Sequence, residues 1–151
     1  MHTGPHRGAA RRRLLIAGLV MGAIAVVVAA CSGGGGLTGE TWQLTANTET
    51  TPASQGVIPE ADQSKYTITF GTDGTWTGQA DCNSVNGTYT TSGSDGIDIT
   101  LGASTMAACP EGSFADLYLA GLDRAETYKV DGSTLTLGLA EGGTFTFAAA
   151  E

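Results

Sequence analysis

Apolar and polar residues alternate with period two along most of the chain after residue 40. In the segment Thr41–Ala46, Trp42 and Leu44 stand on one side and polar residues on the other. This alternation is typical of strands that bury one face. It returns near residues 66–70, 76–80, 87–91, 97–101, 135–139 and 145–147. The pattern therefore predicts a mostly β domain.

Glycine-containing turns separate several of these segments. Asp73-Gly74, Asp131-Gly132 and Glu141-Gly142-Gly143 each lie between two alternating runs. Such dipeptides favour tight β-hairpins because glycine adopts positive φ without steric cost. Residues 48–64 contain two prolines and show no clear period, which predicts a long loop.

One stretch has a helical rather than a strand period. Phe114, Leu117, Tyr118 and Leu122 recur at intervals of three, one and four residues. Ser113, followed three residues later by Asp116, has the arrangement of a capping box. We expect one short helix over residues 113–123, with this apolar face against the sheet.

The N-terminal segment has the features of an export signal. Four arginines precede an uncharged apolar run from Leu14 to Val28. The run ends in Val28-Ala29-Ala30-Cys31, which resembles the lipobox of bacterial lipoproteins, where the cysteine is acylated and becomes the new N-terminus. An uncleaved anchor is the alternative, but the apolar run through Ala30 has only 17 residues, near the lower limit for crossing a bilayer.

These features predict three parts. Residues 1–30 are a lipoprotein signal peptide, residues 31–36 an acylated Cys31 with a glycine-rich tether, and residues 37–151 a folded domain. Two or three acyl chains on one cysteine hold a protein stably at a membrane. We therefore expect a protein anchored on the extracytoplasmic face of a bacterial membrane, through lipid on Cys31.

Removing the signal changes the charge of the protein. The remainder keeps three Lys and Arg residues against all fifteen Asp and Glu residues, a balance of about −12. This charge repels phosphate backbones, so nucleic acid is not expected as a partner. His2 and His6 also leave with the signal, so the mature chain has no histidine to serve as a general base.

Cys82 and Cys109 are the cysteines that remain beside Cys31. An even pair in an exported domain predicts a disulfide. The alternatives are a reactive thiol or part of a metal site. A reactive thiol requires a base or a cationic setting, and a zinc site requires further ligands. The mature sequence offers little of either.

Three motifs resemble the META domain, also called the HslJ-like domain. They are Cys82-Asn83 followed by Gly87 and Tyr89, the run Thr105-Met106-Ala107-Ala108-Cys109, and residues 128–137. The resemblance covers roughly residues 37–148. It implies a compact, antiparallel, barrel-like sheet, which from the segments above has about seven or eight strands, with one helix against it. Asp81 stands where members of the family usually have glycine.

The resemblance supplies no reaction, although family members are associated with stress in the bacterial envelope. We interpret the motif residues Asn83, Gly87, Tyr89, Thr105 and Met106 as structural. Gly87 would allow a backbone geometry closed to other residues, Asn83 a left-handed or self-bonded turn, and Tyr89 a buried ring with a bonded hydroxyl.

The candidate chemistry is sparse. Asp95 and Asp98 lie in a calcium-like loop, but the oxygen ligands are too few and the closing Glu is absent. No cofactor, metal or catalytic residue is predicted. We favour a non-enzymatic lipoprotein that binds a protein or an envelope component. The alternative is a carrier or sensor of a small apolar ligand, with a cavity inside the sheet bordered by Trp76, Phe70 or Phe145.

Overall fold

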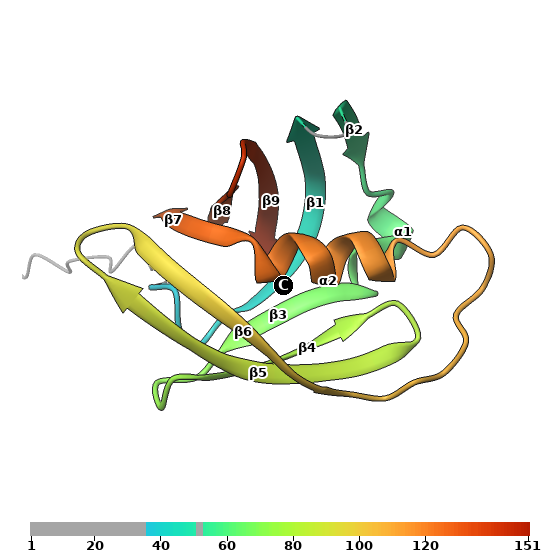
Figure 1. The fold of residues 1–151 in the computed structure, drawn as a ribbon, viewed down its shortest axis with the longest axis horizontal. Helices are drawn as coiled ribbons and strands as arrows, with labels where there is room; N and C mark the ends of the chain where they lie inside the picture. Colours follow the sequence, from blue (N-terminus) through green and yellow to red (C-terminus); the bar gives the residue numbers. More distant parts are fainter. Residues whose placement is uncertain (1–35, 51–52) are drawn as a thin grey trace, which may run out of the picture. The chain divides into compact units, whose positions relative to one another are not determined.

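The computed structural model describes residues 36–50 and 53–151, which form one antiparallel sheet and two helices (Figure 1). The signal peptide, Cys31 and most of the tether lie outside these residues. The elements in chain order are β1 (Thr41–Thr50), β2 (Ala53–Val57), α1 (Glu60–Gln63), β3 (Tyr66–Phe70), β4 (Thr75–Ala80), β5 (Asn83–Ser92), β6 (Gly96–Ser104), α2 (Ala115–Asp123), β7 (Ala125–Asp131), β8 (Thr134–Leu139) and β9 (Gly143–Ala149). Within the described residues, no helix has the length and apolar character needed to cross a membrane.

The sheet closes into a ring because β1 pairs along both of its edges. Residues 41–43 of β1 pair with β3, residues 46–50 pair with β2, and the other edge pairs with β9. The remaining strands follow in chain order, β3 to β9. β2 therefore branches from the ring, and β1 is its one neighbour among the described strands.

The mostly β prediction is confirmed, with nine strands instead of seven or eight and with a second short helix, α1. The long loop predicted over residues 48–64 is wrong. β1 extends to Thr50, and β2 and α1 occupy most of the rest. The period was obscured because the β1–β9 register shifts between Leu44 and Ala46, which breaks the alternation of inward residues. Pro59 sits at the start of α1, where proline is tolerated.

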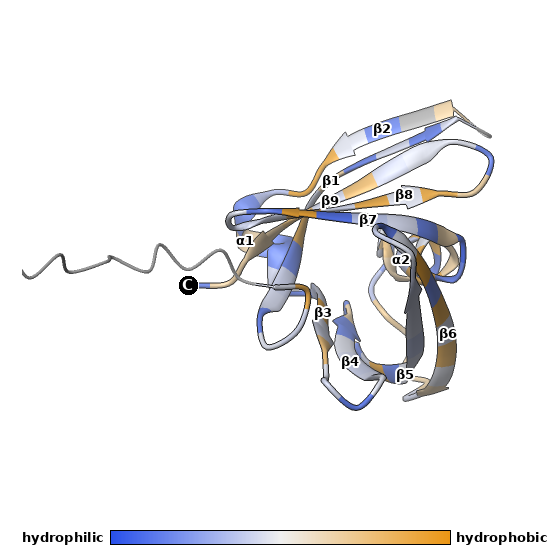
Figure 2. Ribbon diagram, turned by 90° about the vertical axis from the view of Figure 1, so that its left-hand side faces the viewer, coloured by the Kyte–Doolittle hydropathy of each residue, from blue (hydrophilic) through white to orange (hydrophobic). Residues whose placement is uncertain are grey.

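The ring is weakest between β6 and β7. These strands share one ladder pair, Gly96 with Thr127, besides a hydrogen bond from the Tyr128 N–H to the Asp95 carbonyl. Helix α2 lies beside this seam, between β6 and the half of the sheet that contains β7, β8 and β9 (Figures 1 and 2). The helix thus completes the enclosure of the core that the strands leave open.

The core lies inside the ring. Tyr118 and Leu122 of α2 are fully buried there. Apolar residues of the strands alternate with polar ones, as the hydropathy colours in Figure 2 show. Their fully buried members are Trp42, Leu44, Ile68, Phe70, Trp76, Ala80, Leu135, Leu137, Phe145 and Phe147.

The helix prediction is confirmed in position and corrected in detail. α2 begins at Ala115, and its N-cap residue Phe114 makes no side-chain capping bond. The Ser113 hydroxyl instead accepts a hydrogen bond from the Ala115 N–H at 3.2 Å. Leu117, which was expected on the buried face, is 53% exposed.

Candidate functional site

The disulfide predicted between Cys82 and Cys109 is present, with the two Cα atoms 5.5 Å apart. It joins the start of β5 to the segment that leads into α2. Cys82 is exposed and Cys109 is partly buried. The bridge therefore fastens the loop after β6 to the ring, and neither sulfur is available as a free thiol while it is formed.

Asn83 reinforces the same junction. Its side-chain N–H donates to the Ala107 carbonyl at 3.1 Å, and its Oδ1 accepts from the Ala107 N–H at 2.8 Å. Oδ1 also accepts from the Thr105 hydroxyl at 3.0 Å. The amide thus bonds to Ala107 as the backbone of a neighbouring strand would, and it holds residues 105–107 beside the start of β5.

The predicted role of Asn83 in a left-handed turn is wrong, because Asn83 is the first residue of β5. The left-handed residue is Asp81, with φ of +55°. The META resemblance of the sequence implies glycine at this position. Aspartate tolerates this conformation better than most residues do. Asp81 is therefore compatible with the local turn.

Glycine is required at position 87 because a side chain would have no room there, and not because of its backbone angles. This corrects the prediction that Gly87 allows a backbone geometry closed to other residues. A Cβ built on Gly87 would lie 2.6 Å from Nε1 of Trp76. The Trp76 indole packs over Gly87 and donates to the Thr100 carbonyl at 3.2 Å. Any larger residue would displace this ring.

Tyr89 behaves as predicted. Its ring packs edge-on against Phe70, with the centroids 4.8 Å apart, and its hydroxyl donates to the Gly71 carbonyl at 2.6 Å. Met106, in contrast, is 97% exposed. The structure therefore brings Asn83, Thr105 and both cysteines together, while Gly87 and Tyr89 lie elsewhere and Met106 packs against nothing.

A groove lies next to the Cys82–Cys109 junction, between β2 and the N-terminal end of α2. It encloses about 450 Å³ and is open to solvent. We call it the β2–α2 groove. Its lining comes from five stretches of chain and includes Asn47, Ile58, Asp62, Lys65, Asp81, Glu111, Phe114 and Leu117.

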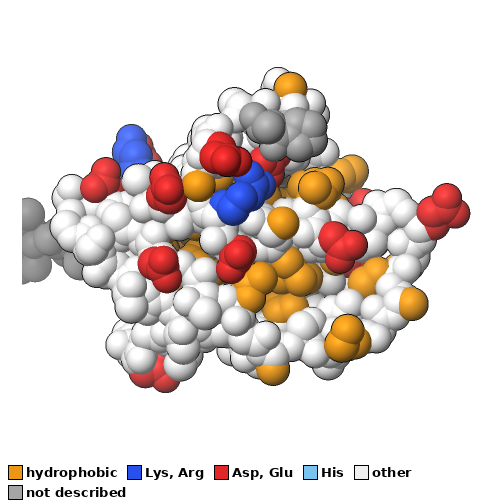
Figure 3. Space-filling model, viewed as in Figure 1, with side chains coloured by type: hydrophobic (Ala, Val, Ile, Leu, Met, Phe, Trp, Pro, Cys, Tyr) orange, Lys and Arg blue, Asp and Glu red, His pale blue; other side chains and the backbone are white. Residues whose placement is uncertain are grey.

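The groove combines an apolar floor with carboxylates. Ile58 is buried, Phe114 is partly buried and Leu117 is half exposed. On the face drawn in Figure 3, apolar side chains gather along and beside α2, with carboxylates around them. An apolar surface with a few polar groups is the ordinary composition of a binding site.

Three carboxylates and one lysine carry the charge of the groove. Lys65 pairs with Asp62 at 2.7 Å. This hydrogen bond, and then the charges of Asp62 and Asp81, hold the pKa of the Lys65 ammonium above its ordinary value. Asp81 and Glu111 form none of the ion pairs found among the described residues.

Asn47 is the polar group at the back of the groove. It is 5% exposed, and its amide oxygen lies across Gly56, 2.8 Å from where a Cβ would be. Asn47 therefore closes the back of the groove beside Gly56.

The sequence did not predict this groove. Its residues come largely from the segment interpreted as a loop and from residues 110–117, with Asn47 and Asp81 beside them, and no local pattern brings these together. Ile58, and Phe114 and Leu117 on the apolar face of the predicted helix, were the available signals. In the described part of the chain, no three His, Cys, Asp or Glu residues cluster as metal ligands would.

The interior of the ring does not resemble a carrier site. Phe70 and Phe145 are fully buried, and Trp76 is 1% exposed. The packing around these three rings therefore argues against the alternative of an enclosed apolar ligand.

Comparison with known families identifies the domain. The family profile described as "META domain" matches residues 35–151. The chain belongs to the META domain family. A comparison with curated proteins finds no match.

Solved structures share the fold of this META domain. An NMR structure of a protein from Burkholderia xenovorans is 27% identical, with a TM-score of 0.58 over 76% of this chain and 83% of that one. A crystal structure of a DUF4847 family protein from Bacteroides vulgatus ATCC 8482 is 19% identical, with a TM-score of 0.53 over 74% and 93% of the two chains. Neither description states an activity.

Proposed function

We propose that this protein is a non-enzymatic, lipid-anchored binding protein of the bacterial envelope, whose META domain holds a protein or an envelope component in the β2–α2 groove. The observation that carries the proposal is the groove itself. It is open to solvent, and it combines an apolar floor with carboxylates.

The sequence supports the anchor and the absence of catalysis. The Val28-Ala29-Ala30-Cys31 motif supports acylation of Cys31, and both histidines precede that residue. The Gly33–Gly36 tether would keep the domain close to the membrane and free to rotate. Family associations indicate envelope stress as the condition under which a partner is engaged.

Intact-mass measurement of the protein extracted from membranes tests the anchor. We expect a chain that begins at Cys31, carries acyl groups and is two hydrogens lighter than its reduced form. The Cys31→Ser variant should leave the membrane fraction. An unacylated wild-type protein, or one that retains residues 1–30, would contradict the proposal.

Photo-cross-linking in living cells tests the binding site. A photoreactive residue at Leu117 lies in the groove, and one at Met106 is exposed outside it. We expect a discrete adduct from position 117, stronger under heat or antibiotic stress, and none from position 106. Equal labelling from both positions, or no adduct from 117 under any condition, would reject the groove as the site.

A further inference from the structure

The free edge of β2 borders the β2–α2 groove. The Ile58 N–H donates to the Thr45 carbonyl at 2.8 Å, so this N–H faces β1, while the Ile58 carbonyl accepts from Nε2 of Gln63 at 3.1 Å. Backbone groups of successive residues in a strand point to opposite edges. Those of Gln55 and Val57 therefore point away from β1, and no described strand pairs with that edge.

The register also tells which side chains face the groove. Gly56 pairs with Asn47, which is buried, and both line the groove together with Ile58. Val57 belongs to the opposite face, where it is 77% exposed. A strand added beside β2 would therefore place alternate side chains in the groove and the others next to Val57.

The composition of the groove selects the chemistry of those side chains. Ile58, Phe114 and Leu117 form an apolar surface, and Asp81 and Glu111 provide negative charge outside the Asp62–Lys65 pair. Lys and Arg match both features, because an aliphatic stem covers apolar surface while the charged head stays near carboxylates. A second copy of this chain fits poorly, since each copy brings the same excess of about twelve negative charges.

We propose that the β2 edge binds an extended segment of a partner protein that carries Lys or Arg at alternate positions and pairs with β2 as an additional antiparallel or parallel strand. The inference rests on the proposed function and specifies the partner chemistry of the same groove. The backbone of the segment would bond to Gln55 and Val57, and its basic side chains would enter the groove, within reach of Asn47 and Glu111.

The test uses the acylated mature protein in detergent micelles and a fluorescent seven-residue peptide of alternating Lys and Val. Fluorescence anisotropy measures affinity, and hydrogen exchange locates the contact. We expect saturable binding that weakens with salt, and slower exchange of the Gln55 and Val57 amides. A matched peptide with Glu in place of Lys should not bind. A peptide N-methylated at alternate bonds keeps its charge but should bind weakly, because it cannot pair with a strand.

Two variants with matched controls test the details. Val57→Pro removes an N–H that faces solvent, and an edge strand tolerates this change. It should weaken peptide binding about five- to ten-fold. The control Val57→Thr keeps the N–H and should bind the peptide more tightly than Val57→Pro. Glu111→Gln should weaken binding about two- to five-fold. Glu126→Gln alters a carboxylate that is also exposed but lies on β7, outside the groove, and should have no effect.

Equal binding of the N-methylated peptide, or exchange protection outside residues 53–58, would overturn the proposal. So would an unchanged affinity of both Val57→Pro and Glu111→Gln. If no basic peptide binds while the cross-link from position 117 persists in cells, the proposed function stands and this inference alone fails. If both are negative, the groove is not a binding site.

Discussion

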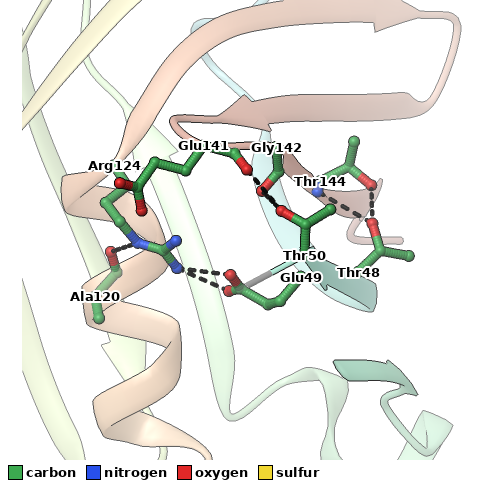
Figure 4. A network of polar contacts seen from close by, with 8 residues as sticks. All are labelled: Thr48, Glu49, Thr50, Ala120, Arg124, Glu141, Gly142 and Thr144. Carbon is green, nitrogen blue, oxygen red and sulfur yellow. Dashed lines mark hydrogen bonds and ion pairs between the residues drawn. The ribbon is translucent and has the colours of Figure 1, made fainter. Parts of the chain in front are cut away.

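Arg124 donates from one guanidinium nitrogen to both carboxylate oxygens of Glu49, at 2.9 and 2.8 Å (Figure 4). Glu49 is 8% exposed and lies near the end of β1, and Arg124 follows the last residue of α2. The Arg124 Nε also donates to the Ala120 carbonyl at 3.1 Å, which satisfies a free carbonyl at the helix end. One side chain therefore joins the helix that covers the seam to the strand that closes the ring.

Replacing Arg124 by Met should destabilise the domain by about 2–4 kcal/mol, because the buried Glu49 carboxylate loses its counter-charge. The double variant Arg124→Met with Glu49→Gln should recover part of this loss. Urea unfolding of the wild type, both single variants and the double variant gives the coupling free energy. If the effects of the two single variants add up to that of the double variant, the interaction between Arg124 and Glu49 contributes nothing to stability.

Asn83→Ala should cost about 1–3 kcal/mol, since it removes four hydrogen bonds to the segment after β6, one of them to the sulfur of Cys109. Reduction of the Cys82–Cys109 bridge, which closes a loop with a sequence separation of 27, should cost about 3–4 kcal/mol. Both changes release the same segment, so their combined cost should be smaller than their sum. Urea unfolding of the wild type and of Asn83→Ala, each with and without reductant, measures the combined cost. Met106→Ala, at an exposed site, is the control and should be neutral. If the two costs add fully, the two features do not share a junction.

The sequence predicted what depends on local pattern. Alternation around Trp42 and Leu44, and the glycine turns, placed most strands, because strand period and turn chemistry act over a few residues. The prediction for residues 48–64 was wrong because the register shift after Leu44 breaks that period. In addition, β2 is held by pairing with β1 instead of by an apolar face of its own.

The candidate site was harder to predict for a similar reason. Cysteine parity and the family motif were sufficient for the Cys82–Cys109 bridge. The role of Gly87 depends on the Trp76 ring on another strand, and that of Asn83 on Ala107, 24 residues away. The groove depends on contacts between segments that no spacing relates, so only the folded chain reveals it.

Gly87→Ala should destabilise the domain by about 2 kcal/mol or more, because the added methyl group would overlap the Trp76 indole and the Thr100 carbonyl. The displacement of Trp76 should change its fluorescence in the folded state. Thr88→Ala, at the exposed neighbouring position on β5, is the control and should leave the fluorescence unchanged. An unaltered spectrum and stability of Gly87→Ala would show that the ring has room to move.

The same chemical change should have opposite effects at two tyrosines. The Tyr118 hydroxyl is fully buried and has no hydrogen-bond partner among the described residues, whereas that of Tyr89 donates to Gly71. Tyr118→Phe should therefore be neutral or stabilise the fold by about 1 kcal/mol, and Tyr89→Phe should cost about 0.5–1.5 kcal/mol. Thermal and urea unfolding compare the two. A clear loss in Tyr118→Phe would indicate a buried water molecule that bonds to the hydroxyl.

Tyr118 also predicts how stability falls at alkaline pH. Burial raises the pKa of its phenol well above the ordinary value of 10.0. The unfolded chain loses this proton above about pH 10 while the folded domain keeps it, so ionisation favours unfolding only as the pH rises through that value. Between about pH 9 and pH 11 the wild type should lose about 1.4 kcal/mol more stability than Tyr118→Phe. If the free energies of unfolding of the two proteins fell equally between these pH values, the Tyr118 hydroxyl would ionise as readily in the folded state as in the unfolded chain.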